Sequence, residues 1–260
     1  MSAGKSEIVW TESTVRADRL RSCRDYAAEA DLGRIVQLAE PQSRELVCDV
    51  VTGLGHMALA LAPSVSRVEA FDPDEAILEE ARALAESQGV ANITYSVADP
   101  AGLPVESGRY DIVTARMALR HTADPGPCLK EMRRVLKESG RLLVADSLAP
   151  DHPEMGGLLE NMMSLCDHSH VKSYTVAEWE NLLDREAFDI HQVEIYPKEH
   201  EFEAWAKREG ADPDSVRMLA LMLHGAAPRA KRHFRVVERR SRPVSFVTWM
   251  ILILARPRGA

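Results

Sequence analysis

The chain has 260 residues, 45% of them hydrophobic, which is enough to bury the core of one α/β domain with an added cap. Its net charge of −8 argues against a general nucleic-acid-binding protein. The apolar run at 247–255 is too short to span a bilayer, which needs about 20 residues. Residues 1–7 carry no signal-peptide core and the four cysteines form no CxxC pair, so we expect a reduced, cytoplasmic protein.

Strands and helices alternate through the first 150 positions of the chain. Apolar residues at helical spacing predict a helix within 12–40, closed by a proline at position 41. Further along, the pattern predicts strands at 46–50, 68–71, 93–97, 110–115 and 141–146, and helices from 56, over 74–88 and over 126–137. This alternation is typical of a doubly wound, mostly parallel, Rossmann-like α/β sheet.

Beyond position 150 the alternation gives way to longer helical stretches. Helices are expected within 153–186 and 200–238, and strands at 188–196 and 244–255. We interpret 1–260 as one domain with a cofactor-binding core at about 40–150. The helical cap, built from insertions at about 151–186 and 199–240, would roof the carboxyl edge of the sheet, where open α/β sheets bind ligands.

A glycine-containing turn joins the first predicted strand to the helix that follows. Gly53 and Gly55 lie in this turn, Asp49 lies on the strand before it, and Asp72 ends the second strand. Glycine lets the backbone approach a ligand closely, and an acid at the tip of the second strand can hold both ribose hydroxyls. The pattern predicts a βαβ unit that binds a nucleotide-like cofactor.

Six stretches of the chain, in order, are similar to motifs of the class I S-adenosylmethionine-dependent methyltransferases. They most resemble the small bacterial ubiquinone and menaquinone biosynthesis enzymes, and they lie at 49–56, 71–73, 98–104, 110–121, 131–137 and 140–146. Looser similarity extends over about 20–255. The resemblance implies S-adenosylmethionine as cofactor and a small molecule as methyl acceptor.

The resemblance also implies roles for individual residues around the cofactor. Gly53 and Gly55 would pass beneath its methionine portion, and Asp49 would position the amino group. Asp72 would hold the ribose hydroxyls, and Ala98 with Asp99 would contact the adenine. Ala115 with Arg116 would close over the methionine side. A carboxylate accepts from two hydroxyl donors readily, which agrees with the place given to Asp72.

Some positions of the turn and of the later motifs depart from the family pattern. Val51 replaces the first glycine, where we expect a β-region backbone that suits a β-branched residue, and Leu54 adds bulk beside the ligand path. Arg120-His121 replaces a pair of histidines, and Cys166 replaces an arginine. These changes favour an alternative in which the fold serves tetrahydrofolate-linked demethylation or dehalogenation, or a non-methylating reaction.

Three residues are candidates for the catalytic chemistry, each with a structural alternative. His121, after the fourth strand, is a base or substrate contact, or a hydrogen-bonding residue at a helix start. His170 is a cleft residue or a helix-end packing residue. Arg116, with Arg120, would bind an anionic substrate group, or form an ion pair with an acid of a neighbouring helix. The histidine spacing matches no common zinc pattern, so no metal is expected.

The sequence therefore predicts an S-adenosylmethionine-dependent methyltransferase acting on a small molecule, with no nucleic-acid or membrane partner. A homodimer is compatible with it. A second alternative is a non-catalytic, methyltransferase-like partner subunit, which would carry a large exposed apolar patch. The basic stretch at 229–242 is interpreted as a solvated face rather than an RNA-binding one.

Overall fold

The computed structural model describes residues 30–259. Of the helix predicted within 12–40, the part at 30–39 is present as α2 (Ala30–Ala39), and 12–29 lies outside the described residues. No helix in the described part of the chain combines the length and apolarity needed to cross a membrane.

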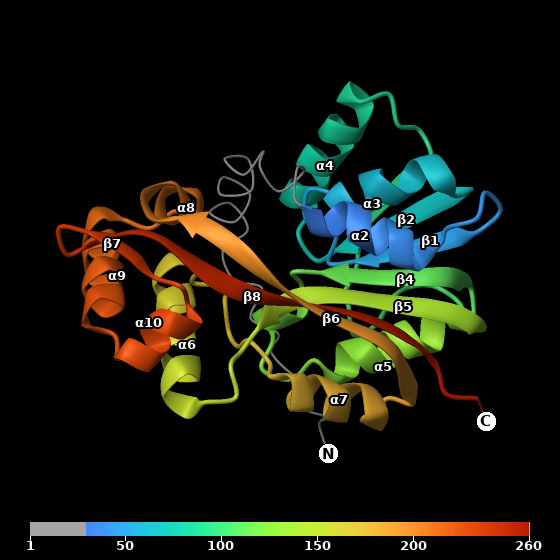
Figure 1. Cartoon of the computed structure of the whole chain (residues 1–260). Helices are drawn as coiled ribbons and strands as arrows, with labels where there is room; N and C mark the ends of the chain where they lie inside the picture. The colour runs from blue at the N-terminus through green and yellow to red at the C-terminus, as the bar shows by residue number, and fades with distance from the viewer. Residues whose placement is uncertain (1–29, 260) are drawn as a thin grey trace, which may run out of the picture.

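The centre of the molecule is an eight-stranded sheet (Figure 1). Seven strands follow the order β3-β2-β1-β4-β5-β8-β6, and β7 pairs with β8 outside that path. The first five are mutually parallel, whereas β8 runs antiparallel to both of its neighbours. The strands are β1 (Leu46–Val50), β2 (Arg67–Asp72), β3 (Ile93–Val97), β4 (Tyr110–Arg116), β5 (Leu136–Leu148), β6 (Phe188–Glu201), β7 (Val237–Arg239) and β8 (Arg242–Pro257). The doubly wound, mostly parallel sheet predicted from the sequence is confirmed.

Helices cover both faces of this sheet, as Figure 1 shows. On one side lie α2, α3 (His56–Leu61) and α4 (Glu75–Ser87), and on the other lies α5 (Gly126–Val135). Local chemistry sets these boundaries: the Asp74 carboxylate accepts from the backbone N–H groups of Ala76 and Ile77, which caps the start of α4. Two short 3₁₀ segments, at Ala62–Ser64 and Leu119–His121, complete this part of the chain.

One helix expected in the cap belongs to the sheet instead. α7 (Val176–Arg185) contacts α5 and β6, and its apolar face enters the core of the sheet. Trp179 and Leu183, one helical turn apart, are buried there against residues of α5 such as Leu129. The apolar stripe of α7 was visible in the sequence, but its spacing does not reveal which surface it meets. The cap interpretation of 151–186 is therefore wrong for α7.

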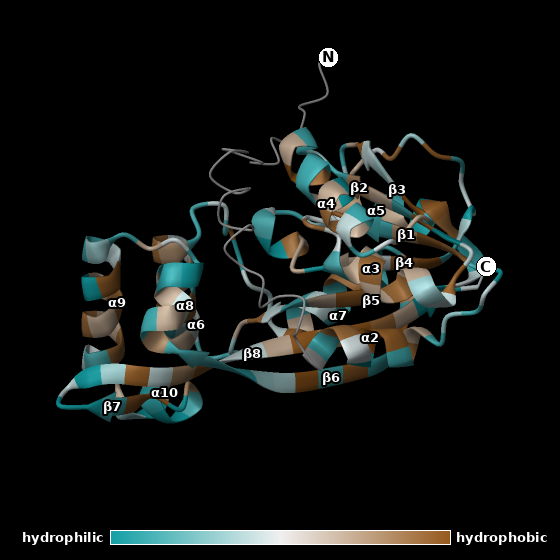
Figure 2. Ribbon diagram, turned by 90° about the horizontal axis from the view of Figure 1, so that it is seen from above, coloured by the Kyte–Doolittle hydropathy of each residue, from teal (hydrophilic) through white to brown (hydrophobic). Residues whose placement is uncertain are grey.

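The remaining insertions form a separate lobe, which we call the cap lobe. It contains β7 and four helices: α6 (Pro153–Cys166), α8 (Phe202–Arg208), α9 (Pro213–Gly225) and α10 (Pro228–His233). The long strands β6 and β8 run from the sheet into it (Figures 1 and 2). Because Trp249 pairs with Leu148 at the end of β5, and Ser245 with Glu201 at the end of β6, the lobe lies beyond the carboxyl edge of the sheet. Its own core includes Trp205, Leu219 and Phe234.

Candidate functional site

The turn after β1 has an unusual backbone. Val51, Gly53 and Gly55 all have positive φ angles, of 56°, 55° and 77°. The expectation of a β-region backbone for Val51 is therefore wrong. A β-branched residue is rarely found in the left-handed region, and strain of this kind gathers at functional sites. The Val51 side chain is buried in the core of the sheet, and this packing holds the strained conformation in place.

Asp72 ties the end of β2 to the glycine turn. Its two carboxylate oxygens accept from the backbone N–H groups of Gly53, at 3.0 Å, and Asp74, at 3.1 Å. These two contacts fix the orientation of the buried Asp72 carboxylate beside the turn. The sequence-predicted pair of glycine turn and second-strand acid is thus one connected unit.

Asp49 is buried behind the same turn and is held by two threonines. The hydroxyl of Thr52 donates to it at 2.5 Å, and that of Thr114, on β4, donates at 2.6 Å. Burial raises the pKa of Asp49 to about 6, although these hydrogen bonds and the charge of Arg116 oppose the rise. Through Asp49, these contacts fasten the turn to β1 and join β1 to β4.

Ala98 and Asp99 follow β3 and lie at the same edge of the sheet. The N–H of Ala98 donates to the carbonyl oxygen of Asp72 at 3.2 Å. The exposed Asp99 side chain accepts from the N–H of Ala101 at 2.9 Å and so caps a turn. The structure therefore brings together the residues predicted to surround the ribose and the adenine.

Two buried polar atoms close to the glycine turn have no hydrogen-bond partner among the residues that the structure describes. One is the hydroxyl of Tyr95, which lies 2.8 Å from the position that a Cβ at Gly55 would take. The other is Nε2 of His56, whose pKa burial lowers to about 4, aided by the charge of Arg116. Buried polar groups are normally paired, so these atoms fit a site that receives a polar ligand. The left-handed glycines and Asp72 are equally suited to a nucleoside cofactor.

Arg116, predicted to contact substrate, forms a buried bidentate ion pair with Asp31 of α2. Its Nε lies 2.8 Å from Oδ2, and its NH2 lies 3.1 Å from Oδ1. Of the two alternatives weighed from the sequence, the structure shows the pairing with a neighbouring helix. The preceding residue, Ala115, is buried within β4, so its side chain faces the core of the sheet.

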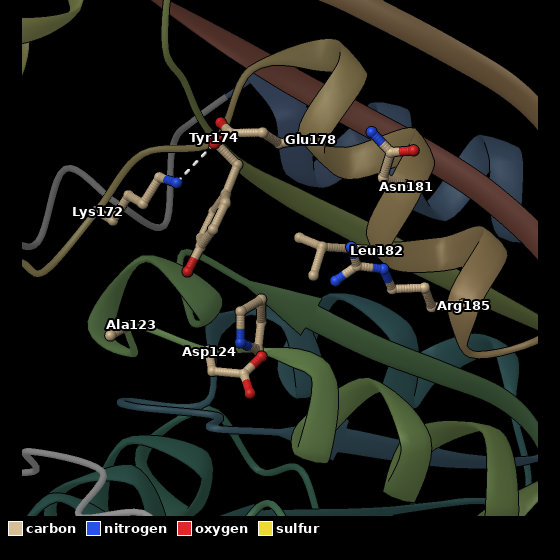
Figure 3. Close-up of a pocket in the computed structure, with 9 residues that line it drawn as sticks. Ala123, Asp124, Lys172, Tyr174, Glu178, Asn181, Leu182 and Arg185 are labelled. Atoms are coloured by element: carbon tan, nitrogen blue, oxygen red, sulfur yellow. Dashed lines mark hydrogen bonds and ion pairs between the residues drawn. The ribbon is translucent and has the colours of Figure 1, made fainter.

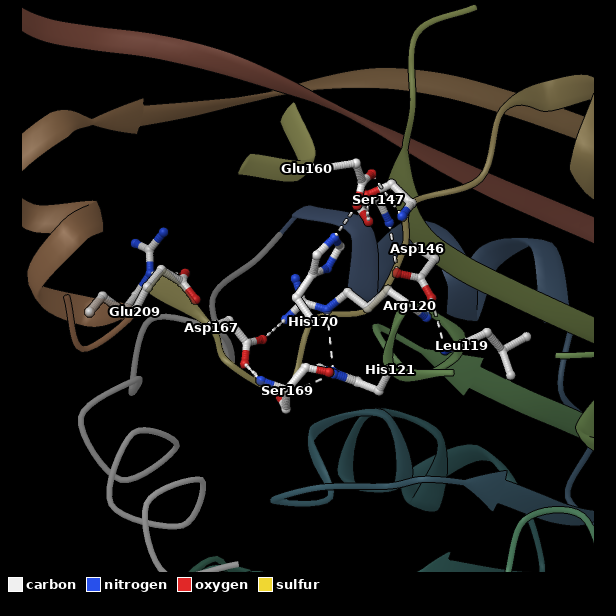
Figure 4. Close-up of polar contacts among 12 residues, drawn as sticks. Leu119, Arg120, His121, Asp146, Ser147, Glu160, Asp167, Ser169, His170 and Glu209 are labelled. Carbon is white, nitrogen blue, oxygen red and sulfur yellow. Dashed lines mark hydrogen bonds and ion pairs between the residues drawn. The ribbon is translucent and has the colours of Figure 1, made fainter. Parts of the chain in front are cut away.

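His121 belongs to a polar network beyond the carboxyl end of β4 (Figure 4). Its Nδ1 lies 3.0 Å from the carbonyl oxygen of Ser169, and Nε of Arg120 donates to its Nε2 at 3.4 Å. Arg120 also pairs with Asp167, at 3.3 Å. Burial opposes ionisation of Asp167, but Arg120, His121 and Ser169 outweigh it and hold its pKa well below the usual range. Both ring nitrogens of His121 are therefore engaged.

His170 lies in the same network and has a different arrangement. Its Nε2 is 2.7 Å from an oxygen of Glu160, on α6, and its side chain is fully buried. Its Nδ1 is buried and, within the described part of the chain, has no hydrogen-bond partner. His168, two residues earlier in the chain, is exposed. Backbone bonds from Val171 and Lys172 to the carbonyl oxygen of Arg120 join this loop to the end of β4.

A separate pocket of about 300 Å³ lies between the start of α5 and α7 (Figure 3). Its wall includes Asp124, Tyr174 and Arg185, and also Lys172, which pairs with Glu178 at 2.6 Å. None of the residues predicted for the site lines this pocket. Within residues 30–259, no group of three or more His, Cys, Asp or Glu side chains is placed to hold a metal ion.

Several residues that build the site were not predicted. They are the partners of the predicted residues, namely Asp31, Thr52, Tyr95, Thr114, Glu160, Asp167 and Ser169. Thr52 and Thr114 lie inside stretches that resemble family motifs, and Asp167 and Ser169 lie close in sequence to His170. Asp31, Tyr95 and Glu160 come from other elements, and no local pattern marks them.

Comparison with known proteins agrees with this geometry. A family model described as a methyltransferase domain matches residues 21–193, more than half of the chain. The uncharacterized methyltransferase YcgJ of Bacillus subtilis (strain 168) is 28% identical over 244 residues, covering 94% of this chain and 96% of that protein. Its crystal structure has a TM-score of 0.85, covering 88% of this chain and 98% of that one.

Two further relatives extend the comparison. The structure of BH2331 from Bacillus halodurans C-125, assigned as a methyltransferase, has a TM-score of 0.85 at 31% identity, covering 89% of this chain and all of that one. The demethylmenaquinone methyltransferase of Clavibacter sepedonicus is 27% identical over 198 residues, covering 74% of this chain and 77% of that enzyme. The chain therefore belongs to the methyltransferase domain family and is a class I S-adenosylmethionine-dependent methyltransferase.

Proposed function

We propose that the chain methylates a small molecule bound between the glycine turn and the cap lobe, with His170 as the base. The observation that carries this proposal is the contact of Glu160 with one ring nitrogen of His170, while the other ring nitrogen is buried and has no partner among residues 30–259. A carboxylate that accepts from one nitrogen of an imidazole leaves the other as the acceptor for a proton.

Methyl transfer is an in-line displacement that needs close approach and, for a hydroxyl or acidic carbon, removal of a proton. S-adenosylmethionine, when bound, supplies an electrophilic methyl group. Asp72 and the backbone of the glycine turn would hold the cofactor, and Asp49 would support that turn from behind. Nδ1 of His170 would accept the proton of the acceptor, with Glu160 orienting the ring and stabilising the charge that forms on it.

His121 is less suited to the role of base than His170. Its Nε2 faces the guanidinium of Arg120, and this positive charge disfavours a further positive charge on the neighbouring imidazole ring. Its Nδ1 is bound to Ser169. We assign it to positioning, since its contacts join the loop after α6 to the end of β4.

The folate-linked alternative rests on the departures from the family pattern, such as those at Val51 and Arg120. It would use basic residues near the cleft to attract an anionic carrier. Arg116 is paired with Asp31 and Arg120 with Asp167, so their charges are compensated within the protein. Methyl transfer from S-adenosylmethionine is the reaction that the site supports best.

The first test is calorimetric titration of the purified protein with S-adenosylmethionine, with tetrahydrofolate as the contrast. We expect saturable binding of the adenosyl compound, and at least about tenfold weaker binding for Asp72→Ala, because a charged acceptor for two hydroxyls is lost. Equal affinity of the variant would remove Asp72 from the cofactor site, and folate binding alone would overturn the proposal.

The second test addresses the acceptor and the base. Because one relative is named a demethylmenaquinone methyltransferase, reduced naphthoquinones are the first acceptors to screen. With an acceptor in hand, His170→Ala should lower kcat by a factor of about 10² or more, with cofactor affinity unchanged. Glu160→Gln should lower kcat less and change its pH profile. The exposed neighbour provides the control: His168→Ala should leave kcat unchanged, and an equal loss there would contradict the assignment.

A further inference from the structure

Positive charge is concentrated in one segment of an otherwise acidic protein. Residues 215–245 contain eight Lys or Arg residues and one Glu, a balance of 8 − 1 = +7. Because the whole chain carries −8, all other residues together carry −8 − 7 = −15. Separation of charge on this scale produces a local field that attracts anions, whatever the net charge of the molecule.

The fold gathers this segment at the far end of the cap lobe, and we call it the basic tip (Figure 1). Glu238, its one acid, joins the pieces: its two oxygens pair with His224 of α9, at 2.8 Å, and Lys231 of α10, at 3.1 Å. The basic tip therefore consists of residues 215–225 of α9, together with α10 and the turn between β7 and β8, and it is held together around one carboxylate.

All seven arginines of the basic tip are exposed. The guanidinium of Arg217 lies 3.8 Å from the carboxylate of Asp214, at the start of α9. Among residues 30–259 the other six have no ion-pair partner: Arg229, Arg232, Arg235, Arg239, Arg240 and Arg242. Arg239 and Arg242 lie directly opposite each other across the β7–β8 ladder. Like charges in this position destabilise a hairpin, so the pair does not serve folding. Figure 2 shows the hydrophilic ribbon at the tip of this hairpin.

The turn itself carries strain. Arg240 and Ser241 have φ angles of 51° and 60°, the left-handed conformation that two-residue hairpin turns require. Asn and Gly adopt this conformation at lower cost in free energy. The arginine at this position therefore makes the turn less stable than Asn or Gly would, while it adds an exposed charge.

Apolar side chains are exposed beside these charges. Four of the eight large hydrophobic residues exposed in the described chain lie in the basic tip: Met218, Leu221, Val237 and Val244. Met218 and Leu221 lie three residues apart on one face of α9 and are 50% and 59% exposed. A partner of the basic tip must therefore offer both anionic groups and an apolar phase.

An anionic lipid bilayer meets both requirements. Its phosphates accept forked hydrogen bonds from arginine, and apolar side chains enter the boundary between headgroups and acyl chains. Single-stranded nucleic acid offers phosphates but is bound through exposed aromatic rings. In the basic tip, Phe234 is buried, and the ring of Trp249 behind it is already covered by Arg235 at 5.1 Å.

We propose that the basic tip docks the protein reversibly on an anionic membrane surface. This departs from the absence of a membrane partner expected from the sequence. The cap lobe would then face the bilayer, and an apolar acceptor could pass between the membrane and the site. The docking itself does not depend on the proposed methyl acceptor.

The test is co-sedimentation of the full chain with phosphatidylcholine vesicles, with and without phosphatidylglycerol, at low and high sodium chloride. We expect binding only to the vesicles that contain phosphatidylglycerol, and weaker binding at high salt. The double variant Arg239→Glu and Arg242→Glu should bind at least about tenfold more weakly. Leu221→Ser should weaken binding as well, because the apolar contact is lost.

The matched control reverses two exposed arginines at the opposite edge of the sheet, Arg44→Glu and Arg67→Glu, and should bind vesicles as the natural chain does. Calorimetry with S-adenosylmethionine verifies that each variant is folded. The proposal fails if vesicles are not bound, if neutral vesicles bind equally, or if the control variant loses as much affinity. It fails also if an oligonucleotide binds the basic tip and vesicles do not displace it.

Discussion

At the scale of single residues, the site depends on groups held in costly states. Among residues 30–259, Asp49 is buried as an acid without an opposing charge in direct contact, and Val51 takes a backbone conformation that β-branched residues avoid. Asp49 lies near the end of β1 and Val51 opens the turn that follows, which we propose holds the cofactor. Local stability has been given up at this turn for a defined geometry, which is the usual pattern at functional sites.

Asp49 predicts a specific dependence of stability on pH. Its pKa rises from 3.8 to about 6 on folding, so the folded protein keeps this proton to a higher pH than the unfolded chain does. The stabilising contribution is full below pH 3.8 and is lost as the pH rises through 6. The side chain of Asp49→Asn cannot ionise. Between pH 4 and pH 7, the free energy of unfolding of this variant should therefore rise by about 3 kcal/mol relative to that of the natural chain. Urea unfolding across this range measures it, and parallel pH profiles for the two proteins would contradict it.

The left-handed backbone at position 51 predicts an inverted order of two substitutions. Val51→Ala and Val51→Gly both remove the branched side chain, but only glycine adopts positive φ without strain. Val51→Gly should therefore be more stable than Val51→Ala by about 1 kcal/mol. At Val50, in the adjoining strand, the order should reverse, because glycine weakens a regular strand. Denaturant unfolding of the four variants measures these differences in stability. If the alanine variant were more stable than the glycine variant at both positions, the backbone of Val51 would not be strained.

At the scale of elements, helix ends show how closely local sequence determines structure. The helix expected at 74–88 is α4 at Glu75–Ser87, capped by the aspartate that precedes it. α7 begins with a complete capping box, in which the Thr175 hydroxyl accepts from the N–H of Glu178 and the Glu178 side chain accepts from the N–H of Thr175. Both signals are short in sequence and independent of the rest of the fold.

The capping box predicts the cost of its loss. Thr175→Ala should lower the free energy of unfolding by about 1 kcal/mol, because a backbone N–H at the start of α7 loses its acceptor. Thr175→Ser keeps the oxygen and should cost little. Thermal or urea unfolding of both variants tests this, and equal losses would show that packing of the threonine methyl, rather than capping, is responsible.

At the scale of the whole molecule, the packing falls into distinct units. Two cores lie on the two faces of the sheet, and a third fills the cap lobe, with no residue shared among them. The lobe core is joined to the sheet mainly by the strands β6 and β8, which run through both parts (Figure 1). Such an arrangement permits the lobe to open locally while the sheet stays folded.

Trp205→Ala tests this division. Trp205 is buried in the lobe core against Phe246, and removing its ring should cost the lobe about 3–5 kcal/mol. Limited proteolysis should then increase within the cap lobe, while the affinity for S-adenosylmethionine stays within about twofold. Leu129→Ala, in the sheet core, should instead weaken both. If Trp205→Ala also abolished cofactor binding, the lobe and the sheet would form one cooperative unit.

The amino-acid sequence by itself determined the order of strands and helices in the core, the glycine turn, the acid at the end of β2 and the family. These features are encoded in neighbouring residues, through periodicity, capping and turn chemistry. The strands β5 and β6 are longer than those predicted at 141–146 and 188–196. The tertiary structure alone decided the left-handed backbone of Val51, the burial of α7 on the sheet, the pairing of Arg116 with Asp31 and the contact of His170 with Glu160. Each of these depends on which surfaces and charges meet across long separations in the chain, and local propensity carries no information about such meetings.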